Sequence, residues 1–561
     1  MNATEPAAQF TRHLIAIPAA ALVAVLVIAP CRTSVAAEPP PLVVARDTTY
    51  LTGPLDQHGE VDYVAALDKI LSVGATPENN FVAAFWKIFG PRHISKDVRT
   101  EYLRRIGLPN LPEKGDYYVD DYTYRKQRHK PPEDYVEEGD FDENWATTNN
   151  PWTEHTHPWF VPWLKDQEPY LDRLVAATKL THRYEPMLTT PDMPGFDGLF
   201  LPSIGEIHEA TRSLCRRAMF RTAQGKFDAA ADDLLAVRRM ARLHANAAWI
   251  TVDLSTGYSL DSSARKAGTA MLDQPGFTLA HVRRLQRDRK ALPPLRSMAE
   301  AIDRSERLTA LDYARRVRRG GLQTIVDEAK RKADPLGLVQ NEEGKFVEKK
   351  PDAKWPKEFV APFDRMLAER VDWSRLLREV NAHYDRLAAA ARMPYLERRA
   401  ATERLYERKT KFPSLTEILA GADRMTKDEA TALLARIVID DCRGGVSYCE
   451  LSEARHLTLT RTEDLALDLA EYRLRFGSYP PTLAHLSKLE SDTPRIDPFT
   501  GKAFVYRLEE EGYLLYSFGP NLRDDGGKQA YYDAKQMKSL HEDCDDMIVR
   551  MPKPNAKENR R

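Results

Sequence analysis

KFDAAADDLLAVRRMARLH (residues 226–244) decides the fold class of this chain of 561 residues. Its apolar side chains recur every three or four positions, so they fall on one face of a helix. They are Phe227, Ala230, Ala231, Leu234, Val237 and Ala241. The segment before it has the same spacing at Ile207, Ala210, Leu214 and Ala218. Gly225 lies between the two segments and predicts the turn of a helical hairpin.

A hairpin of small-residue helices closed at a glycine resembles one tetratricopeptide-type unit. The unit does not recur at a period of about 34 residues, so the sequence does not predict a full solenoid. Further amphipathic segments follow at 279–318 and 358–408. We therefore predict a mainly α fold, with a helical, tetratricopeptide-like body over residues 201–455.

The charge balance limits the possible partners. Lys and Arg total 82 against 83 Asp and Glu, which leaves a formal charge of −1. A nucleic-acid-binding protein normally carries a strongly basic surface, so this balance argues against nucleic acid as a partner. The basic cluster Arg315-Arg316-Val317-Arg318-Arg319 is interpreted as a solvated helix end.

The N-terminus predicts export. LIAIPAAALVAVLVIAP (residues 14–30) is an apolar run, and Val35-Ala36-Ala37 places small residues before Glu38. This order is typical of a signal peptide over residues 1–37, which is removed from an exported protein. A retained membrane anchor is the alternative, and only in that case would the chain contact a membrane. We expect a periplasmic or secreted protein.

Four cysteines follow the predicted cleavage site: Cys215, Cys442, Cys449 and Cys544. An oxidising compartment permits a disulfide, for which Cys442 and Cys449 are the best candidates. Buried or free thiols are an equally good interpretation.

Residues 38–200 are predicted to be an irregular, aromatic-rich region with helical stretches at 61–73 and 81–89. Tyr, Trp and acidic residues crowd 116–163 without a period, which indicates packed loops. Asp140, Asp142 and Glu143 lie near tryptophans there. Glycosidases pair carboxylates in aromatic clefts, so a secreted hydrolase acting on glycan or peptide, with its site in 116–163, is the alternative function.

The last hundred residues change in character. Thr460-x-x-Glu463 has the pattern of a capping box and predicts a helix that ends at Gly477. Two strands are predicted at 503–508 and 513–518, joined as an antiparallel hairpin.

Several motifs here resemble the globular domain of type II secretion major pseudopilins, which implies a small α+β, pilin-like domain over 456–555. They are Tyr472-Arg473, Gly477-Ser478-Tyr479-Pro480, Asp497-Pro498-Phe499-Thr500-Gly501-Lys502, Tyr513-x-x-Tyr516-Ser517-x-Gly519 and Glu542-Asp543-Cys544-Asp545-Asp546-Met547-Ile548. Pseudopilins polymerise through a long apolar N-terminal helix joined to this domain. The joined helix here is short and polar on one side, so filament assembly is not implied. The whole arrangement resembles a group of secreted proteins typical of planctomycete-type bacteria.

In pseudopilins the hairpin is followed by a calcium-binding loop, so the resemblance implies a calcium site here. Its candidate ligands are Asp524, Asp525, Asp543, Asp545 and Asp546. Calcium takes six to eight oxygen ligands in irregular geometry, which suits a loop with several carboxylates. Lysines at 528, 535 and 538 offer an alternative, because they would neutralise the acids without an ion.

No catalytic motif occurs in a suitable context, so we expect a protein that is not an enzyme. We predict an exported cell-envelope protein of the binding or scaffold type, with a protein partner in the envelope and a calcium-stabilised, pilin-like module. The sequence leaves the partner and the oligomeric state open.

Overall fold

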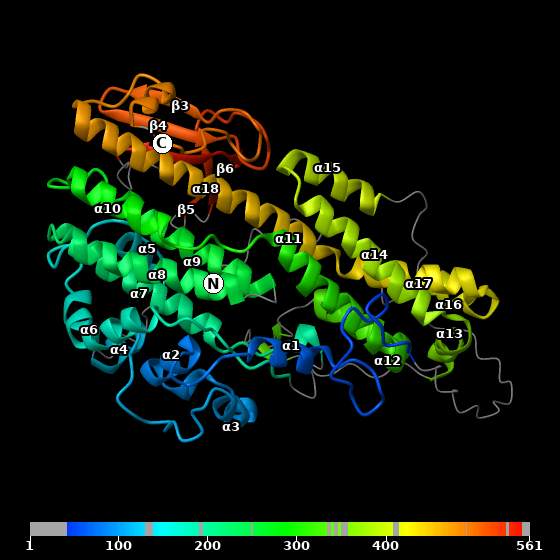
Figure 1. Cartoon of the computed structure of the whole chain (residues 1–561). Coiled ribbons are helices and arrows are strands. Elements are labelled where there is room, and N and C mark those ends of the chain that lie inside the picture. The colour runs from blue at the N-terminus through cyan, green and yellow to red at the C-terminus, as the bar shows by residue number, and fades with distance from the viewer. Residues whose placement is uncertain are drawn as a thin grey trace. The chain divides into compact units, whose positions relative to one another are not determined.

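The structure is a computed structural model that describes part of the chain. The described residues are 42–128, 138–189, 195–247, 251–333, 338–340, 346–348, 357–407, 415–489, 491–533 and 538–552. All of them belong to one compact unit, Pro39–Arg561. The predicted signal peptide at 1–37 lies outside the described residues. The described part is mainly helical, with small antiparallel sheets near the C-terminus, which confirms the predicted fold class at this level (Figure 1).

Helices occupy much of the region that the sequence predicted to be irregular. They are α1 (Tyr63–Leu71), α2 (Phe81–Phe89), α3 (Lys96–Arg105), α4 (Asp121–Arg128), α5 (Glu138–Asn149) and α6 (Phe160–Ala177), with short 3-10 turns at Pro91–His93 and Phe196–Gly198. The helical stretches predicted at 61–73 and 81–89 are confirmed as α1 and α2. The prediction of packed loops over 116–163 was wrong, because α4, α5 and the start of α6 lie there. Asp121 and Tyr124 face inward on α4, and charged and aromatic side chains of this kind leave no aliphatic period to detect.

Polar side chains begin several of the helices. Asp62 accepts a hydrogen bond from the Ala65 N–H at the start of α1. Asn80 does the same for α2 through the N–H of Val82. Such caps satisfy backbone donors that have no partner within the helix.

The helical hairpin predicted from 226–244 is confirmed. It consists of α7 (Ser203–Ala223) and α8 (Phe227–Ala247), and Gly225 turns between them with a φ of 72°. The next helix, α9 (Thr251–Thr269), packs closely on α8. A Cβ at Gly257 would lie 2.7 Å from the Ala241 carbonyl oxygen, so this glycine lets the two backbones approach.

The second half of the body is also helical. It comprises α10 (Leu279–Lys290), α11 (Met298–Ala301), a π-helical turn (Ile302–Glu306), α12 (Arg307–Ala333), α13 (Lys357–Arg370), α14 (Trp373–Ala391), α15 (Tyr395–Tyr406), α16 (Leu415–Gly421), a 3-10 turn (Ala422–Arg424) and α17 (Lys427–Asp441). A short ribbon of β1 (Leu338–Gln340) and β2 (Phe346–Glu348) follows α12. Two apolar cores result. One joins α2, α3 and α6–α10, and the other joins α1 with α11–α17.

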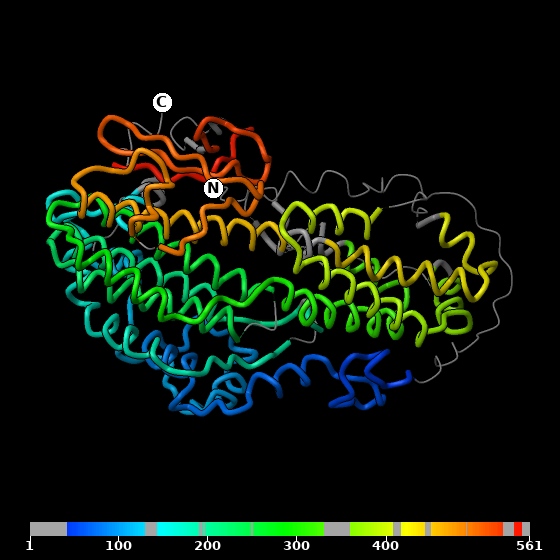
Figure 2. Tube along the Cα trace, turned by 45° about the horizontal axis from the view of Figure 1, so that its top comes forward, coloured from blue at the N-terminus to red at the C-terminus, as the bar shows by residue number. Residues whose placement is uncertain are grey.

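One long helix, α18 (Arg443–Phe476), links the two halves. It contacts α11, α15 and α17 at one end and α9, α10 and the C-terminal sheet at the other. Figure 2 shows it running from the yellow part of the chain to the orange part. The sequence prediction that this helix begins at Thr460 was wrong. Its end at Gly477, with a φ of 82°, is confirmed.

The C-terminal sheets follow a 3-10 segment at Leu483–Leu489. The larger sheet has the order β3 (Val505–Glu509), β4 (Gly512–Ser517), β7 (Met547–Met551), and all pairs are antiparallel. The predicted hairpin is therefore confirmed as β3–β4. A second ribbon, β5 (Gln529–Asp533) with β6 (Lys538–Asp545), is inserted between β4 and β7. Every residue of the central strand β4 is buried, and Leu515 joins the same core as α8.

The basic cluster at 315–319 ends the first part of α12, before a kink at Gly321 with a φ of 64°, but most of it is not solvated as the sequence suggested. Arg318 is buried and forms an ion pair with Glu60, and Arg319 Nε lies 2.5 Å from the same carboxylate. Arg315 Nη1 lies 3.0 Å from Asp56 Oδ2. These pairs offset part of the charge of the cluster and attach the N-terminal loop to α12.

Candidate functional site in the C-terminal acidic loop

The acidic loop connects the central strand β4 to the edge strand β7, with the β5–β6 ribbon as an excursion. Gly519 begins it with a φ of 65°. A side chain at Gly519 would collide with the backbone of Asp545, so the two ends of the loop touch at this glycine.

Asp545 and Asp546 are the most enclosed of the five predicted ligands. The N–H of Asn521 donates to Asp545 Oδ2 at 2.9 Å, and the N–H of Gly527 donates to Asp546 Oδ2 at 2.7 Å. The other oxygen of each carboxylate, Oδ1, is buried and has no hydrogen-bond partner among the described residues. Asp546 is only 1% exposed. Buried polar atoms without a partner are uncommon and suggest a missing ligand or water.

Asp524 and Asp525 form the turn on the opposite side of the loop. Asp524 Oδ1 accepts hydrogen bonds from the Tyr516 hydroxyl and from the N–H of Gly526, both at 2.9 Å. Asp525 Oδ2 accepts from the N–H of Asp545 at 3.1 Å, which ties the two sides together. Asp543 is different, because its side chain is exposed to solvent.

Asn521 organises the loop, although the sequence prediction did not include it. Its side-chain amide donates to Asp525 Oδ2 at 2.9 Å and to the Asp543 carbonyl oxygen at 3.1 Å. Its position after the Gly519-Pro520 turn was the available signal, since asparagine favours such turns. Arg523 also donates to the Asp543 carbonyl oxygen, at 2.7 Å, and places a cation at the rim of the loop.

The electrostatics of the loop disfavour ionised carboxylates at its centre. Burial raises the pKa of Asp546 to about 6, and the neighbouring charges of Asp525 and Asp524 act in the same direction. Burial also raises the pKa of Asp545. By contrast, the hydrogen bond from Asn521 lowers the pKa of Asp525. A cation near these oxygens would relieve the repulsion.

The donors of the loop are only partly gathered into one place. The loop brings Asp524, Asp525, Asp545 and Asp546 into one interacting group, and it leaves the Asp543 carboxylate at the surface. Across the residues described, no three His, Cys, Asp or Glu side chains are grouped as a ready-made metal site. The two unpartnered oxygens and the nearby main-chain carbonyls are the donor types that calcium takes.

The residues predicted for the alternative, hydrolytic site serve packing where the structure describes them. Glu143 forms an ion pair with Arg125 at 3.2 Å. Trp152 is buried, stacks on Phe220 and donates to the Arg216 carbonyl oxygen at 3.0 Å. The side chains of Asp140 and Asp142 lie outside the described residues, so the hydrolase stays a prediction.

The side chain of Cys449 also lies outside the described residues, and the predicted disulfide with Cys442 is therefore not tested. Cys215 is buried on α7.

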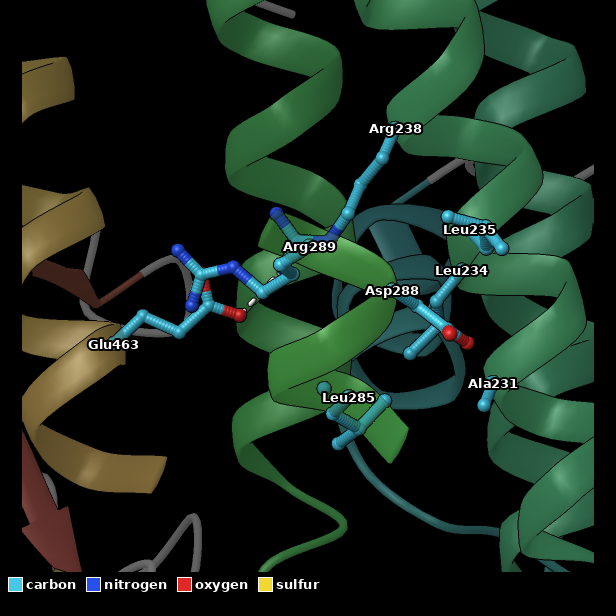
Figure 3. A pocket seen from close by; sticks show the side chains of 9 residues that line it. Ala231, Leu234, Leu235, Arg238, Leu285, Asp288, Arg289 and Glu463 are labelled. Atoms are coloured by element: carbon cyan, nitrogen blue, oxygen red, sulfur yellow. Dashed lines mark hydrogen bonds and ion pairs between the residues drawn. The ribbon is translucent and has the colours of Figure 1, made fainter. Parts of the chain in front are cut away.

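A buried ion-pair cluster between α8, α9, α10 and α18 was missed by the sequence analysis. Arg238 lies between Asp261 at 3.3 Å and Glu463 at 2.5 Å, and Arg289 lies 3.1 Å from Glu463 (Figure 3). A cavity of about 20 Å³ adjoins them, which is room for one water molecule. Glu463 therefore does not cap a helix but attaches the middle of α18 to the body.

None of the helices in the described ranges combines the length and apolar character needed to cross a membrane. The apolar run at 14–30 lies outside the described residues. Comparison of the chain with protein-family models, with curated proteins and with solved structures gave no significant match, so its family is not shown by relatives.

Proposed function

We propose that this chain is an exported, non-enzymatic binding protein of the cell envelope whose C-terminal module is stabilised by calcium. The observation that carries the proposal is the pair of buried oxygens, Asp545 Oδ1 and Asp546 Oδ1, for which the described residues offer no hydrogen-bond donor. They lie in a loop that already contains two further carboxylates.

Calcium suits this loop because it accepts irregular geometry and several carboxylates at once. Asp545 and Asp546 would face the ion with their free oxygens, and Asp524 and Asp525 would supply charge from the opposite turn. The ion would then hold the β6–β7 corner against the turn after β4. Its role would be structural, since nothing described beside the loop is an activated nucleophile.

The finer description of the fold belongs to the same proposal. A helix, an antiparallel hairpin, an acidic loop and a returning edge strand β7 follow one another, as expected for a pilin-like module. The hairpin of α7 and α8, extended by α9, supports a tetratricopeptide-like body that offers helical surfaces to a protein partner.

The aromatic and acidic residues after 116 that the structure describes have structural roles, which favours binding over hydrolysis. Trp152 and Trp163 are buried in the core, and Glu143 is occupied by Arg125. Nucleic acid is disfavoured as a partner, because Arg315, Arg318 and Arg319 of the basic cluster are already paired with Asp56 and Glu60.

The test is calorimetric titration of the full-length mature chain with calcium chloride, together with thermal melts in calcium and in chelator. We expect one calcium site and a midpoint that is higher by a few degrees, because a ligand bound only to the folded state stabilises it by RT ln(1 + [L]/Kd). Asp546→Asn should abolish both effects.

Asp492→Asn is the matched control, because Asp492 is an exposed carboxylate outside the loop that pairs with Lys290. It should bind calcium as the parent does. Absence of heat and of any melting shift in the parent chain, or equal binding by Asp546→Asn, would refute the calcium site.

A further inference from the structure

A groove of about 300 Å³ lies between α14 and α15, on the surface of the second half of the body. Its walls are helix faces, because the lining positions follow the helical spacing on both elements. The residues are Arg386, Ala389 and Ala390 from α14, Met393 from the turn after it, and Ala401, Arg404 and Leu405 from α15.

The groove has an apolar floor and a cationic rim. Ala389, Ala390, Ala401 and Leu405 supply apolar lining, and Met393 is 39% exposed among them. One arginine projects from each wall. Arg386 and Arg404 are exposed, and the described part of the chain offers neither of them an ion-pair partner.

Within α14 and α15 the other arginines form ion pairs, whereas Arg392, just after α14, donates only to the Ala388 carbonyl oxygen. Arg399 pairs with Glu403 on the same helix at 3.1 Å. Arg307 pairs with Asp385 at 2.7 Å, so that acid is also occupied. Glu397 on α15 and Glu407 just after it are exposed, and neither lines the groove.

Contacts on the sides away from the groove fix α14 and α15 in place, so the groove is preformed. Tyr384 and Leu387 bury the opposite face of α14 in the second core. On α15, Arg398 Nη1 lies 2.5 Å from Glu453 Oε2 of α18, and the hydroxyl of Thr402 donates to Glu450. A preformed groove avoids the entropy cost of ordering its walls on binding.

We propose that this groove binds an acidic amphipathic helix of a partner protein. Small floor residues leave space for large apolar side chains of a docked helix, and the adaptable Met393 packs against them. Arginine binds carboxylates through two parallel hydrogen bonds, so Glu or Asp beside the apolar face would pair with Arg386 and Arg404. This inference rests on the proposed binding function and names the chemistry of the partner segment.

The probe is a fluorescent peptide of roughly 14 residues, about 21 Å as a helix, with Leu on one face and Glu on both flanks. Its anisotropy is measured with the full-length mature chain. We expect saturable binding that weakens at least tenfold in Arg386→Ala/Arg404→Ala and weakens with added salt. Ala389→Glu places a negative charge, of the same sign as the peptide's, in the groove at an exposed helix position. This variant should not bind the peptide.

Arg399→Ala is the matched control, since Arg399 lies on α15 but outside the groove, and it should bind the peptide as the parent does. A peptide with Lys in place of Glu should not bind. Equal affinity of the arginine double variant, equal binding of the Lys peptide, or a preference for vesicles of anionic lipid over the Glu peptide would each overturn the proposal.

The outcome for the groove is separable from the proposed binding function. If crosslinking in envelope extracts captures the same partner with the parent chain and with Ala389→Glu, the groove is not the docking site but the binding function stands. If the parent chain captures nothing and does not bind the peptide, both fail.

Discussion

His383 shows at the residue scale how burial alone makes stability depend on pH. It lies on α14, is 4% exposed, and its ring contacts Tyr384 and Tyr406 at centroid distances of 5.9 and 5.2 Å. Its Nε2 has no hydrogen-bond partner within the described residues. Burial, and then the charge of Arg386, lower the pKa of His383 to about 4.

The consequence has a definite sign. Between about pH 6.5 and about pH 4 the unfolded chain takes up a proton on His383 that the folded chain does not, so stability falls as the pH falls. His383→Phe keeps the ring and removes the titration. Below about pH 6.5 the difference in free energy of unfolding between the variant and the parent should therefore grow in favour of the variant. It should grow by about 1.4 kcal/mol for each unit that the pH falls, which makes about 2 kcal/mol at about pH 5.

Urea unfolding at several pH values between about 7.5 and 5 measures this difference. A constant difference between His383→Phe and the parent across this range would contradict the assignment.

At the element scale, α18 is one continuous helix where the sequence suggested a beginning at Thr460. A helix that begins at Thr460 and a continuous helix predict different effects of proline at position 461. Proline is tolerated at the first position of a helix, but inside a helix it removes a hydrogen bond and clashes with the preceding turn, which costs about 3 kcal/mol or more. Arg461→Pro should therefore destabilise the chain strongly.

Arg461→Ala is the reference, because Arg461 also donates to the Ile496 carbonyl oxygen at 2.6 Å. We expect the free energy of unfolding of Arg461→Pro, measured in urea, to be at least about 3 kcal/mol lower than that of Arg461→Ala. Similar stability of the two variants would show that a helix end near Thr460 is compatible with the fold.

The elements that the sequence predicted correctly are those with aliphatic periodicity. The α7–α8 hairpin and the β3–β4 hairpin were predicted from Leu, Val and Ala at regular spacing and from glycines at the turns. The elements that it missed bury charge. Glu463 has the spacing of a cap but pairs with Arg238, a residue 225 positions away, and a single sequence does not reveal such a partner.

The acidic loop was likewise predicted only in part. Its location and four of its carboxylates follow from local sequence and from the pseudopilin resemblance. The outward side chain of Asp543 and the role of Asn521 depend on the register of β5 with β6, which local sequence does not specify.

At the scale of the whole molecule, one core unites the C-terminal sheet with the first half of the body. Leu234 of α8, Leu469 of α18 and Leu515 of β4 are buried in the same cluster. The separate domain predicted over 456–555 stays a prediction. The shared core leads us to expect cooperative unfolding of these three elements, since removing one exposes the apolar surface of the others.

Native-state hydrogen exchange of the whole chain tests this expectation. Amides of α8 and β4 should open with the same free energy and the same dependence on denaturant. Opening of β4 at a free energy several kcal/mol lower, with α8 still protected, would show that the C-terminal part unfolds alone.

The attachment of the N-terminal loop to α12 has a consequence for the timing of synthesis. Arg315 and its partner Asp56 are 259 residues apart. At roughly 5–20 residues per second, about 13 to 50 s pass between the synthesis of the acid and that of its cation. The contact that fixes the early segment to the second half of the body therefore forms only after α12 has been synthesised.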